Sequence, residues 1–223
     1  MDTIEAIILG IVQGLTEFLP VSSSGHLQIA KALMGVEIEQ NLLFDVTLHA
    51  ATVLSTIVVL WSEVARLLRG LFSRRFNEEQ AYVLKLLLSM IPIGIVGFTL
   101  KDRLDALLES PAILLVVGCM LLVTAALLAF AYYAKPRQKA QLSYRDAFLI
   151  GVAQAVAALP GLSRSGSTIA TGLLLGNRKQ TVAQFSFLMV LAPILGETFL
   201  ELMKGNLGAQ AIGSAPLAAG FVA

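Results

Sequence analysis

Two short segments of this chain carry residue types that could bind and transfer a phosphate group. The first runs from Glu17 to His26 and contains a carboxylate, an imidazole and three consecutive serines. The second runs from Pro160 to Thr168 and contains an arginine among four hydroxyl residues. Carboxylates and imidazoles can move protons, and a guanidinium can bind phosphate oxygens in a planar fork. Phosphoryl transfer needs this combination, because it depends on positioning the phosphate and neutralising its charge.

The first segment predicts a helix, a break at Pro20 and a second helix that opens with polar residues. Gln13 and Glu17 are four residues apart, so they share one face of the first helix. The second helix offers hydroxyls and free N–H groups to an anion, from Ser22, Ser23, Ser24 and Gly25. We expect Glu17 to bind a metal ion or to accept a proton. His26 is expected to act as nucleophile or as general base on water, and Ser23 is a second candidate nucleophile.

The second segment has the same pattern, with an anion clamp in place of the acid–base groups. Arg164 is expected to hold the phosphate. Gln13 and residues of both turns should bind it as well, and those of the second turn are Ser163, Ser165, Gly166 and Thr168. Arg164 should therefore face Glu17 and His26 across one pocket. The same residues can also be interpreted as purely structural. The hydroxyls could cap or pack helices, Arg164 could pair with Glu17 only to hold the fold, and His49 could line the cavity or pack beside it.

The composition places both segments in a membrane protein. Hydrophobic residues make up 57% of the 223 residues, charged residues only 14%, and the mean hydropathy is +0.79. A soluble domain carries about 25% charged residues, so lipid must cover the excess apolar surface. A net charge of +1 gives no indication of a nucleic-acid partner. The single cysteine, Cys119, excludes a disulfide within the chain.

Four stretches are long and apolar enough to span a bilayer: 42–62, 82–100, 111–133 and 181–203. Two connecting loops are rich in arginine and lysine and are expected to face the cytoplasm, namely 63–81 and 134–146. The loops at 36–41 and 101–110 are acidic or mixed and are expected to face outward. The N-terminus lacks the basic region of a cleavable signal peptide, and the final stretch, 215–223, is expected to be a helix cut short.

The chain contains an internal repeat at an offset of 141 residues. The segment 6–35 matches 147–176 without a gap, and the pairs include Gln13 with Gln154 and Gly25 with Gly166. Each copy predicts two short helices around a proline break. Such arms, of about 10–15 residues, are too short to span and suggest a re-entrant hairpin. Three spans separate the copies, so the second hairpin should enter from the opposite side.

The predicted fold class is therefore an all-α polytopic membrane protein. It is an inverted-topology repeat whose two re-entrant helical hairpins meet near the membrane midplane. The single integral domain covers 1–223, with repeat 1 at about 4–62, linking spans at 82–133 and repeat 2 at about 145–203. The alternative is two kinked pairs of spanning helices packed by small residues, with the Ser-Gly turns as simple helix breaks.

The two segments resemble the signature motifs of the undecaprenyl-diphosphate phosphatase (bacitracin-resistance) family of bacterial membrane enzymes. Residues 13–26 resemble the family's acidic motif with its Ser-Gly-His tail, and residues 160–168 resemble its Arg-Ser motif. The likeness extends from about residue 4 to the end of the chain. At position 13 this chain has Gln13 where many members carry glutamate, so a mechanism with two carboxylates does not apply here.

The resemblance implies hydrolysis of undecaprenyl diphosphate to the monophosphate, which recycles the carrier lipid for peptidoglycan synthesis. It also implies a divalent cation, Mg²⁺ or alternatively Ca²⁺, with Glu17 as a ligand. The site is expected to open to the outer, periplasmic face of the bacterial cytoplasmic membrane. A polyprenyl-phosphate lipid transporter or flippase is the alternative function, because inverted repeats with broken helices are typical of carriers. The expected partners are the lipid substrate and membrane lipid, and a homodimer is left open.

Overall fold

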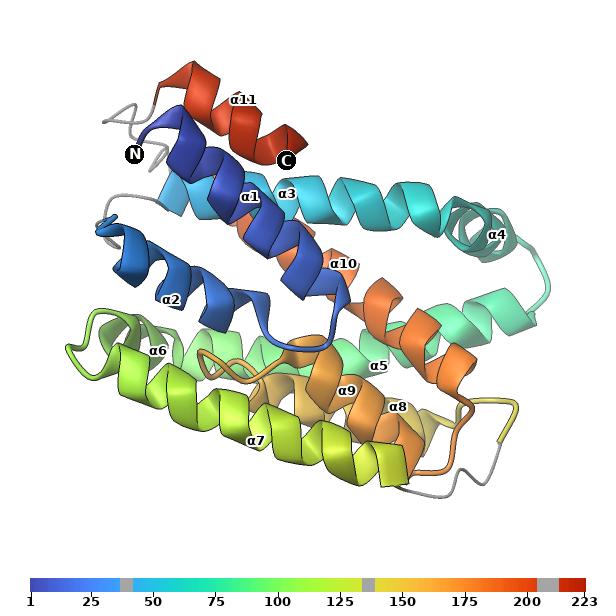
Figure 1. Cartoon of the computed structure of the whole chain (residues 1–223). Helices are drawn as coiled ribbons and strands as arrows, with labels where there is room; N and C mark the ends of the chain where they lie inside the picture. Colours follow the sequence, from blue (N-terminus) through green and yellow to red (C-terminus); the bar gives the residue numbers. More distant parts are fainter. Residues whose placement is uncertain (37–41, 134–138, 204–212) are drawn as a thin grey trace.

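The computed structural model of the chain describes residues 1–36, 42–133, 139–203 and 213–223, and the regular elements in these ranges are helices (Figure 1). They are α1 (Thr3–Phe18), α2 (Ser23–Met34), α3 (Leu42–Val59), α4 (Trp61–Leu71), α5 (Glu78–Thr99), α6 (Lys101–Leu108), α7 (Ile113–Tyr133), α8 (Tyr144–Val156), α9 (Arg164–Leu174), α10 (Lys179–Met203) and α11 (Ser214–Val222). α5 and α7 are long and apolar enough to cross a membrane. The expectation of an all-helical membrane protein is confirmed.

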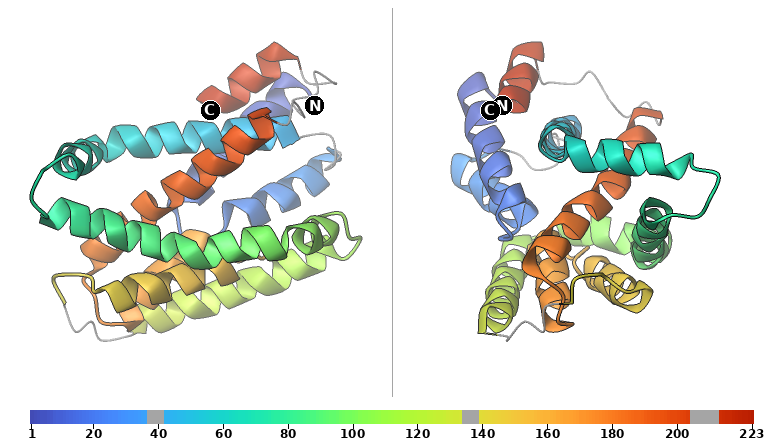
Figure 2. Two further views of the ribbon diagram at one scale, coloured as in Figure 1. Left: turned by 180° about the vertical axis from the view of Figure 1, so that it is seen from behind. Right: turned by 90° about the vertical axis from the view of Figure 1, so that its right-hand side faces the viewer.

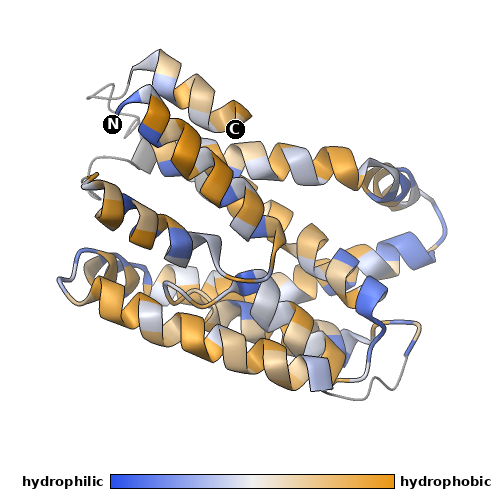
Figure 3. Ribbon diagram, viewed as in Figure 1, coloured by the Kyte–Doolittle hydropathy of each residue, from blue (hydrophilic) through white to orange (hydrophobic). Residues whose placement is uncertain are grey.

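Two helical hairpins lie at the centre of the bundle. α1 and α2 form the first, joined by the turn that contains Pro20, and α8 and α9 form the second, joined by the turn that contains Pro160. The two hairpins open toward opposite ends of the molecule, and their turns meet between those ends (Figure 1). Hydrophilic residues gather toward the ends of the long helices, and apolar residues cover most of the length between (Figure 3).

Each hairpin packs against a hydrophobic core, and the two cores use corresponding residues. The first core contains Ala6, Leu9, Phe44 and Leu48, from α1 and α3. The second contains Ala147, Ile150, Phe185 and Met189, which follow those residues at the repeat offset of 141 and come from α8 and α10. All eight are almost completely inaccessible. The repeat in the sequence is therefore also a repeat in the packing.

Buried polar contacts fix the open ends of both hairpins. Lys31 of α2 is 1% exposed, and its Nζ lies 2.7 Å from both carboxylate oxygens of Asp45 on α3. At the other hairpin, Asp146 at the start of α8 accepts hydrogen bonds from Asn177 Nδ2 at 3.2 Å and from Lys139 Nζ at 3.5 Å. Charges buried in this way need a partner, so these contacts specify how each arm returns to its own end.

Two predicted loops contain helices, and one predicted span is shorter than expected. The span predicted at 42–62 ends with α3 at Val59, and α4 leaves it at an angle of 79° inside the predicted loop 63–81. α6 occupies most of the predicted loop 101–110. The prediction was wrong there because it weighed the charges of these segments and not their helical spacing. The acidic residues Glu37 and Glu39 lie outside the described residues.

We expect Gly151→Ala to destabilise the contact between α8 and α5. A Cβ at this position would lie 2.3 Å from the Ser89 carbonyl oxygen, a backbone atom that cannot turn away. Overpacking of this kind costs about 1–3 kcal/mol, which should lower the Tm in detergent by several degrees. Gly118→Ala is the matched control, because a Cβ there meets nothing within 4 Å. Equal Tm values for the two variants would contradict this packing.

Candidate active site

The turns of the two hairpins touch at backbone distance. A Cβ on Gly25, near the start of α2, would lie 3.1 Å from Gly161 Cα in the second turn. A Cβ on Gly166, near the start of α9, would lie 2.8 Å from the Pro20 carbonyl oxygen in the first turn. At the repeat offset of 141, Gly25 corresponds to Gly166 and Pro20 corresponds to Gly161. The two contacts are therefore equivalent, and each copy contacts the other in the same way. Only residues without a side chain permit this approach.

The first serine of each turn caps the helix that follows. Ser22 Oγ accepts a hydrogen bond from Gly25 N at 3.3 Å, and Ser163 Oγ accepts one from Gly166 N at 3.0 Å. In each turn, the serine two residues further along lies close to the capping hydroxyl. Ser24 Oγ lies 3.3 Å from Ser22 Oγ, and Ser165 Oγ lies 3.4 Å from Ser163 Oγ. The capping interpretation of Ser22 and Ser163 is therefore confirmed, and both glycines serve the close approach.

Glu17 lies at the end of α1 among three polar partners. Its Oε2 accepts hydrogen bonds from Ser23 Oγ and, at 3.0 Å, from Gln13 Nε2. Its Oε1 lies 4.0 Å from Arg164 Nη2, across the contact between the hairpins. The structure thus brings together the carboxylate and the guanidinium that were expected to face each other. Ser23 and Gln13 hold the carboxylate in place.

His26 is oriented by the first turn and not by Glu17. Its Nδ1 lies 2.8 Å from the Ser22 carbonyl oxygen, which can only accept. Nδ1 is therefore the donor in this hydrogen bond, and in the neutral ring the acceptor would be Nε2. No hydrogen bond or ion pair joins His26 to Glu17 among the described residues. Ser22 has φ 74°, the one positive φ of a described non-glycine residue, and this strained backbone presents the carbonyl to the ring.

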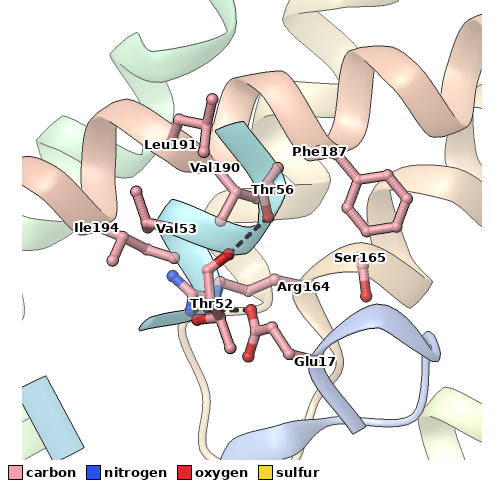
Figure 4. Close-up of a pocket in the computed structure, with 10 residues that line it drawn as sticks. All are labelled: Glu17, Thr52, Val53, Thr56, Arg164, Ser165, Phe187, Val190, Leu191 and Ile194. Carbon is pink, nitrogen blue, oxygen red and sulfur yellow. Dashed lines mark hydrogen bonds and ion pairs between the residues drawn. The ribbon is translucent and has the colours of Figure 1, made fainter. Parts of the chain in front are cut away.

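A pocket lies beside the Glu17–Arg164 pair (Figure 4). Its polar wall comes from Glu17, Arg164, Ser165 and two threonines of α3, Thr52 and Thr56. Its apolar wall comes from α3 and α10, through Val53, Phe187, Val190, Leu191 and Ile194. With its opening the pocket holds about 380 Å³ of empty space.

The threonines of α3 were not predicted, although their spacing gives a signal. His49, Thr52 and Thr56 follow one another at intervals of three and four residues, so they share one face of α3. His49 also acts electrostatically on the Glu17 carboxylate. His49 does not line the pocket itself, so the structure places it beside the cavity, on the same face of α3 as Thr52 and Thr56.

Of the predicted site residues, only Glu17, Arg164 and Ser165 line the pocket, and the others, Ser23 and His26 included, lie outside its lining. Thr168 is completely buried and donates to the carbonyl oxygens of Arg164 at 2.9 Å and of Ser165 at 3.1 Å. Its hydroxyl is therefore directed into α9. Ser163 and Gly166 are buried at the helix cap, whereas Ser24 is exposed at the first turn.

The donor groups fit a divalent cation only in part. The described residues contain no group of three or more His, Cys, Asp or Glu side chains placed to hold a metal ion. Beside Glu17, however, the Oε1 of Gln13 is buried without a hydrogen-bond partner among these residues. Mg²⁺ is often held by one or two protein oxygens together with substrate phosphates and water. Glu17 and Gln13 therefore fit a cation that takes its other ligands from the substrate.

Thr124 of α7 supports the second turn and was missed by the sequence analysis. Its Oγ1 accepts a hydrogen bond from Ser163 N at 3.0 Å and donates to the Gly161 carbonyl oxygen at 3.4 Å. Val117 packs so closely that a Cβ on Gly161 would lie 2.8 Å from its Cα. A lone threonine in the apolar run of α7 carries no pattern, so only the fold reveals its role.

Comparison with known proteins gives consistent matches along the chain. The sequence model of the family described as "Bacitracin resistance protein BacA" matches residues 6–223. A protein of Parabacteroides distasonis named "Undecaprenyl-diphosphatase" is 62% identical over the whole chain, which covers 84% of that protein. Proteins of Bacteroides fragilis and Bacteroides thetaiotaomicron with the same name are 60% and 57% identical, and the chain covers 84% and 85% of their lengths.

We expect Thr124→Val to destabilise the protein. Valine keeps the shape of threonine but leaves Ser163 N–H and Gly161 C=O without their partner, which costs about 1–3 kcal/mol for a buried group. The Tm in detergent should fall by several degrees. Thr124→Ser retains the hydroxyl and should keep most of the stability. If valine were as stable as serine at this position, the two hydrogen bonds would not support the turn.

Proposed function

The chain belongs to the bacitracin resistance protein BacA family, and from this membership we propose that it hydrolyses undecaprenyl diphosphate to the monophosphate and inorganic phosphate. Relatives that are 57–62% identical over the whole chain carry the name of this phosphatase. The structural observation that supports the proposal most directly is the Glu17–Arg164 pair at the pocket, with Ser23 bound to the same carboxylate. These groups supply the base, the anion clamp and a nucleophile.

We also propose that the two hairpins are an inverted, re-entrant repeat within one integral membrane domain. Corresponding residues form the two cores, and the reciprocal contacts of Gly25 and Gly166 relate the hairpins as in a two-fold pair. Their open ends point in opposite directions (Figure 1). Since neither turn reaches the far end of the bundle, the irregular backbone is enclosed by protein at membrane depth, where such backbone is tolerated.

The pocket binds the diphosphate headgroup through Arg164. The guanidinium contacts phosphate oxygens, and Ser165 Oγ and the N-terminus of α9 add hydrogen-bond donors. The apolar wall formed by α10 and α3 receives the first part of the polyprenyl chain, which leaves the bundle sideways into lipid. Gln13, Ser22 and Ser24 complete the polar surroundings at the first turn. This arrangement separates the charged head of the substrate from its tail.

Ser23 is the nucleophile that the geometry supports best. Its hydroxyl donates to Glu17, so the pair already has the hydrogen bond of a nucleophile and its base. Ser23 Oγ attacks the terminal phosphorus, Glu17 accepts the hydroxyl proton, and the anhydride P–O bond breaks. The electron pair of that bond leaves with undecaprenyl monophosphate, while Arg164 neutralises the phosphoryl oxygens.

Water then attacks the phosphoserine, the P–O bond to Ser23 breaks, and Glu17 returns the proton to Ser23 Oγ as inorganic phosphate is released. The Nε2 of His26 is free to accept a proton from that water, since Nδ1 is bound to the Ser22 carbonyl. A divalent cation, Mg²⁺ or Ca²⁺, held by Glu17 and Gln13 Oε1 would supply further charge neutralisation at the phosphates. Direct attack of water, or attack by His26, is the alternative to a phosphoserine.

We propose that the site opens to the outer face of the bacterial cytoplasmic membrane. The arginine-rich connection between α4 and α5 lies at the end of the bundle toward which the second hairpin opens (Figure 1), and basic loops face the cytoplasm. The polar face of α3 runs from the opposite end toward the pocket through Asp45, His49 and Thr52. That face gives water and phosphate a polar route on the outer side.

Transport of a polyprenyl phosphate without hydrolysis is not favoured. The names of the relatives describe a phosphatase, and the contact between Ser23 and Glu17 has a role in hydrolysis that a carrier does not need. Release of phosphate by the purified protein in detergent, where no transport can occur, distinguishes the two functions.

We expect Glu17→Ala, His26→Ala and Arg164→Ala each to lower phosphate release from undecaprenyl diphosphate in detergent by about 100-fold or more. Loss of a proton acceptor or of an anion clamp typically has an effect of this size. Gln13→Ala should have a milder effect, because Gln13 positions Glu17 without supplying a catalytic charge. Cys119→Ser, at an exposed position of α7, is the control. Parent-level activity in all three folded variants would refute the site.

Removal of divalent cations should lower phosphate release by at least about tenfold, because charge neutralisation at the phosphates is lost. EDTA-treated protein is assayed before and after addition of Mg²⁺ or Ca²⁺, and the addition should restore activity. The Tm without substrate should be unaffected by EDTA, since the cation takes most of its ligands from the substrate. Full activity in EDTA would contradict the cation.

A further inference from the structure

The helix α4 is placed differently from the other helices around it. It follows α3 after a single residue and is bent away from it by 79°. Figure 1 views α4 along its axis while α3 runs across the picture, and the right-hand view of Figure 2 shows the reverse. A helix nearly perpendicular to one that runs through the bundle has the orientation of a helix on a membrane surface.

One side of α4 carries large apolar residues that the described chain does not cover. Trp61, Leu68 and Phe72 follow one another at intervals of seven and four residues, so they share one face. Their exposed fractions are 60%, 51% and 84%, and Phe76 beyond the helix is 70% exposed. By contrast, Leu67 on the side that faces the protein is buried. We name the exposed set, Trp61, Leu68, Phe72 and Phe76, the apolar stripe.

Of the four arginines beside the apolar stripe, three have no acidic partner among the described residues. Arg66 is engaged, since it lies 2.6 Å from Glu63 and 4.0 Å from Glu79. Arg69, Arg74 and Arg75 are exposed and form no ion pair with a described residue. A helix with an apolar side and basic residues at its edge is typical of one that lies in the headgroup region.

The connection that carries these arginines is fixed to the start of α5. Asn77 Nδ2 donates to the Gly70 carbonyl oxygen at 2.9 Å, and Gln80 Nε2 donates to the carbonyl oxygens of Leu71 and Ser73, both at 3.0 Å. A Cβ on Gly70 would lie only 2.4 Å from Glu79, so α4 rests closely on α5. The three arginines and the apolar stripe therefore keep one arrangement.

We propose that α4 and residues 72–76 form a binding surface for anionic phospholipids. The apolar stripe enters the boundary of the acyl chains, and Arg69, Arg74 and Arg75 bind the headgroup phosphates. A second copy of the chain fits this surface less well, because a two-fold contact through the stripe would place the same cations against themselves. The lipid surface supplies the opposite charge. It also continues the hydrophobic environment of the bundle.

The chain contains a single tryptophan, Trp61, which reports on this surface directly. The full-length protein is reconstituted in phosphatidylcholine vesicles that contain a minor fraction of a brominated lipid, either phosphatidylglycerol or phosphatidylcholine. Bromine in the acyl chains quenches a tryptophan that they touch. We expect brominated phosphatidylglycerol to quench Trp61 several-fold more than the same fraction of brominated phosphatidylcholine.

The variant Arg69→Gln/Arg74→Gln/Arg75→Gln should abolish this preference, so that the two brominated lipids quench Trp61 equally, because these three arginines attract the anionic headgroups. The control Arg103→Gln/Arg145→Gln/Lys179→Gln also removes three positive charges, at exposed positions outside α4 and its connection, and should keep the preference. Phosphate release in phosphatidylcholine verifies that all three proteins are folded.

Three results would overturn the proposal. Equal quenching by the two brominated lipids in the parent protein would show that the surface does not select anionic lipid. A preference lost in the control variant would assign the effect to net charge. No quenching by either lipid would show that protein covers the stripe, as in a contact between two copies.

Discussion

A carboxylate at membrane depth is unfavourable, by about 2.5–3.5 kcal/mol, unless a cation or a polar cavity lies beside it. In the proposed re-entrant arrangement, Glu17 satisfies this constraint through Arg164, which lies on the other hairpin and about 150 positions further along the chain. The pairing is available only when the two turns approach closely. Gly25 and Gly166 allow that approach, because any side chain at Gly166 would strike the Pro20 carbonyl. The ion pair thus links the approach of the two turns to the assembly of the pocket.

The two copies share a backbone plan but supply different chemistry. Ser23 and Arg164 are equivalent in the repeat, as are Glu17 and Ala158. In a reciprocal pair of hairpins, equivalent positions face the same centre from opposite sides. In the proposed mechanism, one side therefore holds the nucleophile and its base while the other holds the anion clamp. Two identical turns would place like charges together and could not supply different chemical groups to one site.

The helices outside the hairpins determine how firmly each turn is held. α7 fixes the second turn through Thr124, which bonds to both Ser163 and Gly161. The first turn is held mainly by its own contacts, including the strained Ser22 and its carbonyl bond to His26. Thr124 therefore ties the turn that precedes Arg164 to α7. α4 contributes no residue to the lining of the pocket.

The sequence alone determined the membrane class, the repeat and the two chemical turns, because each is a local pattern of hydropathy, spacing and residue type. The offset of 141 even identified the equivalent core residues Phe44 and Phe185. Only the tertiary structure decided that Ser23, rather than His26, touches Glu17, and that Thr168 is directed into its own helix. It also added Thr52, Thr56 and Thr124. The direction of a side chain depends on its rotamer and on neighbours from distant helices, and a local sequence pattern determines neither.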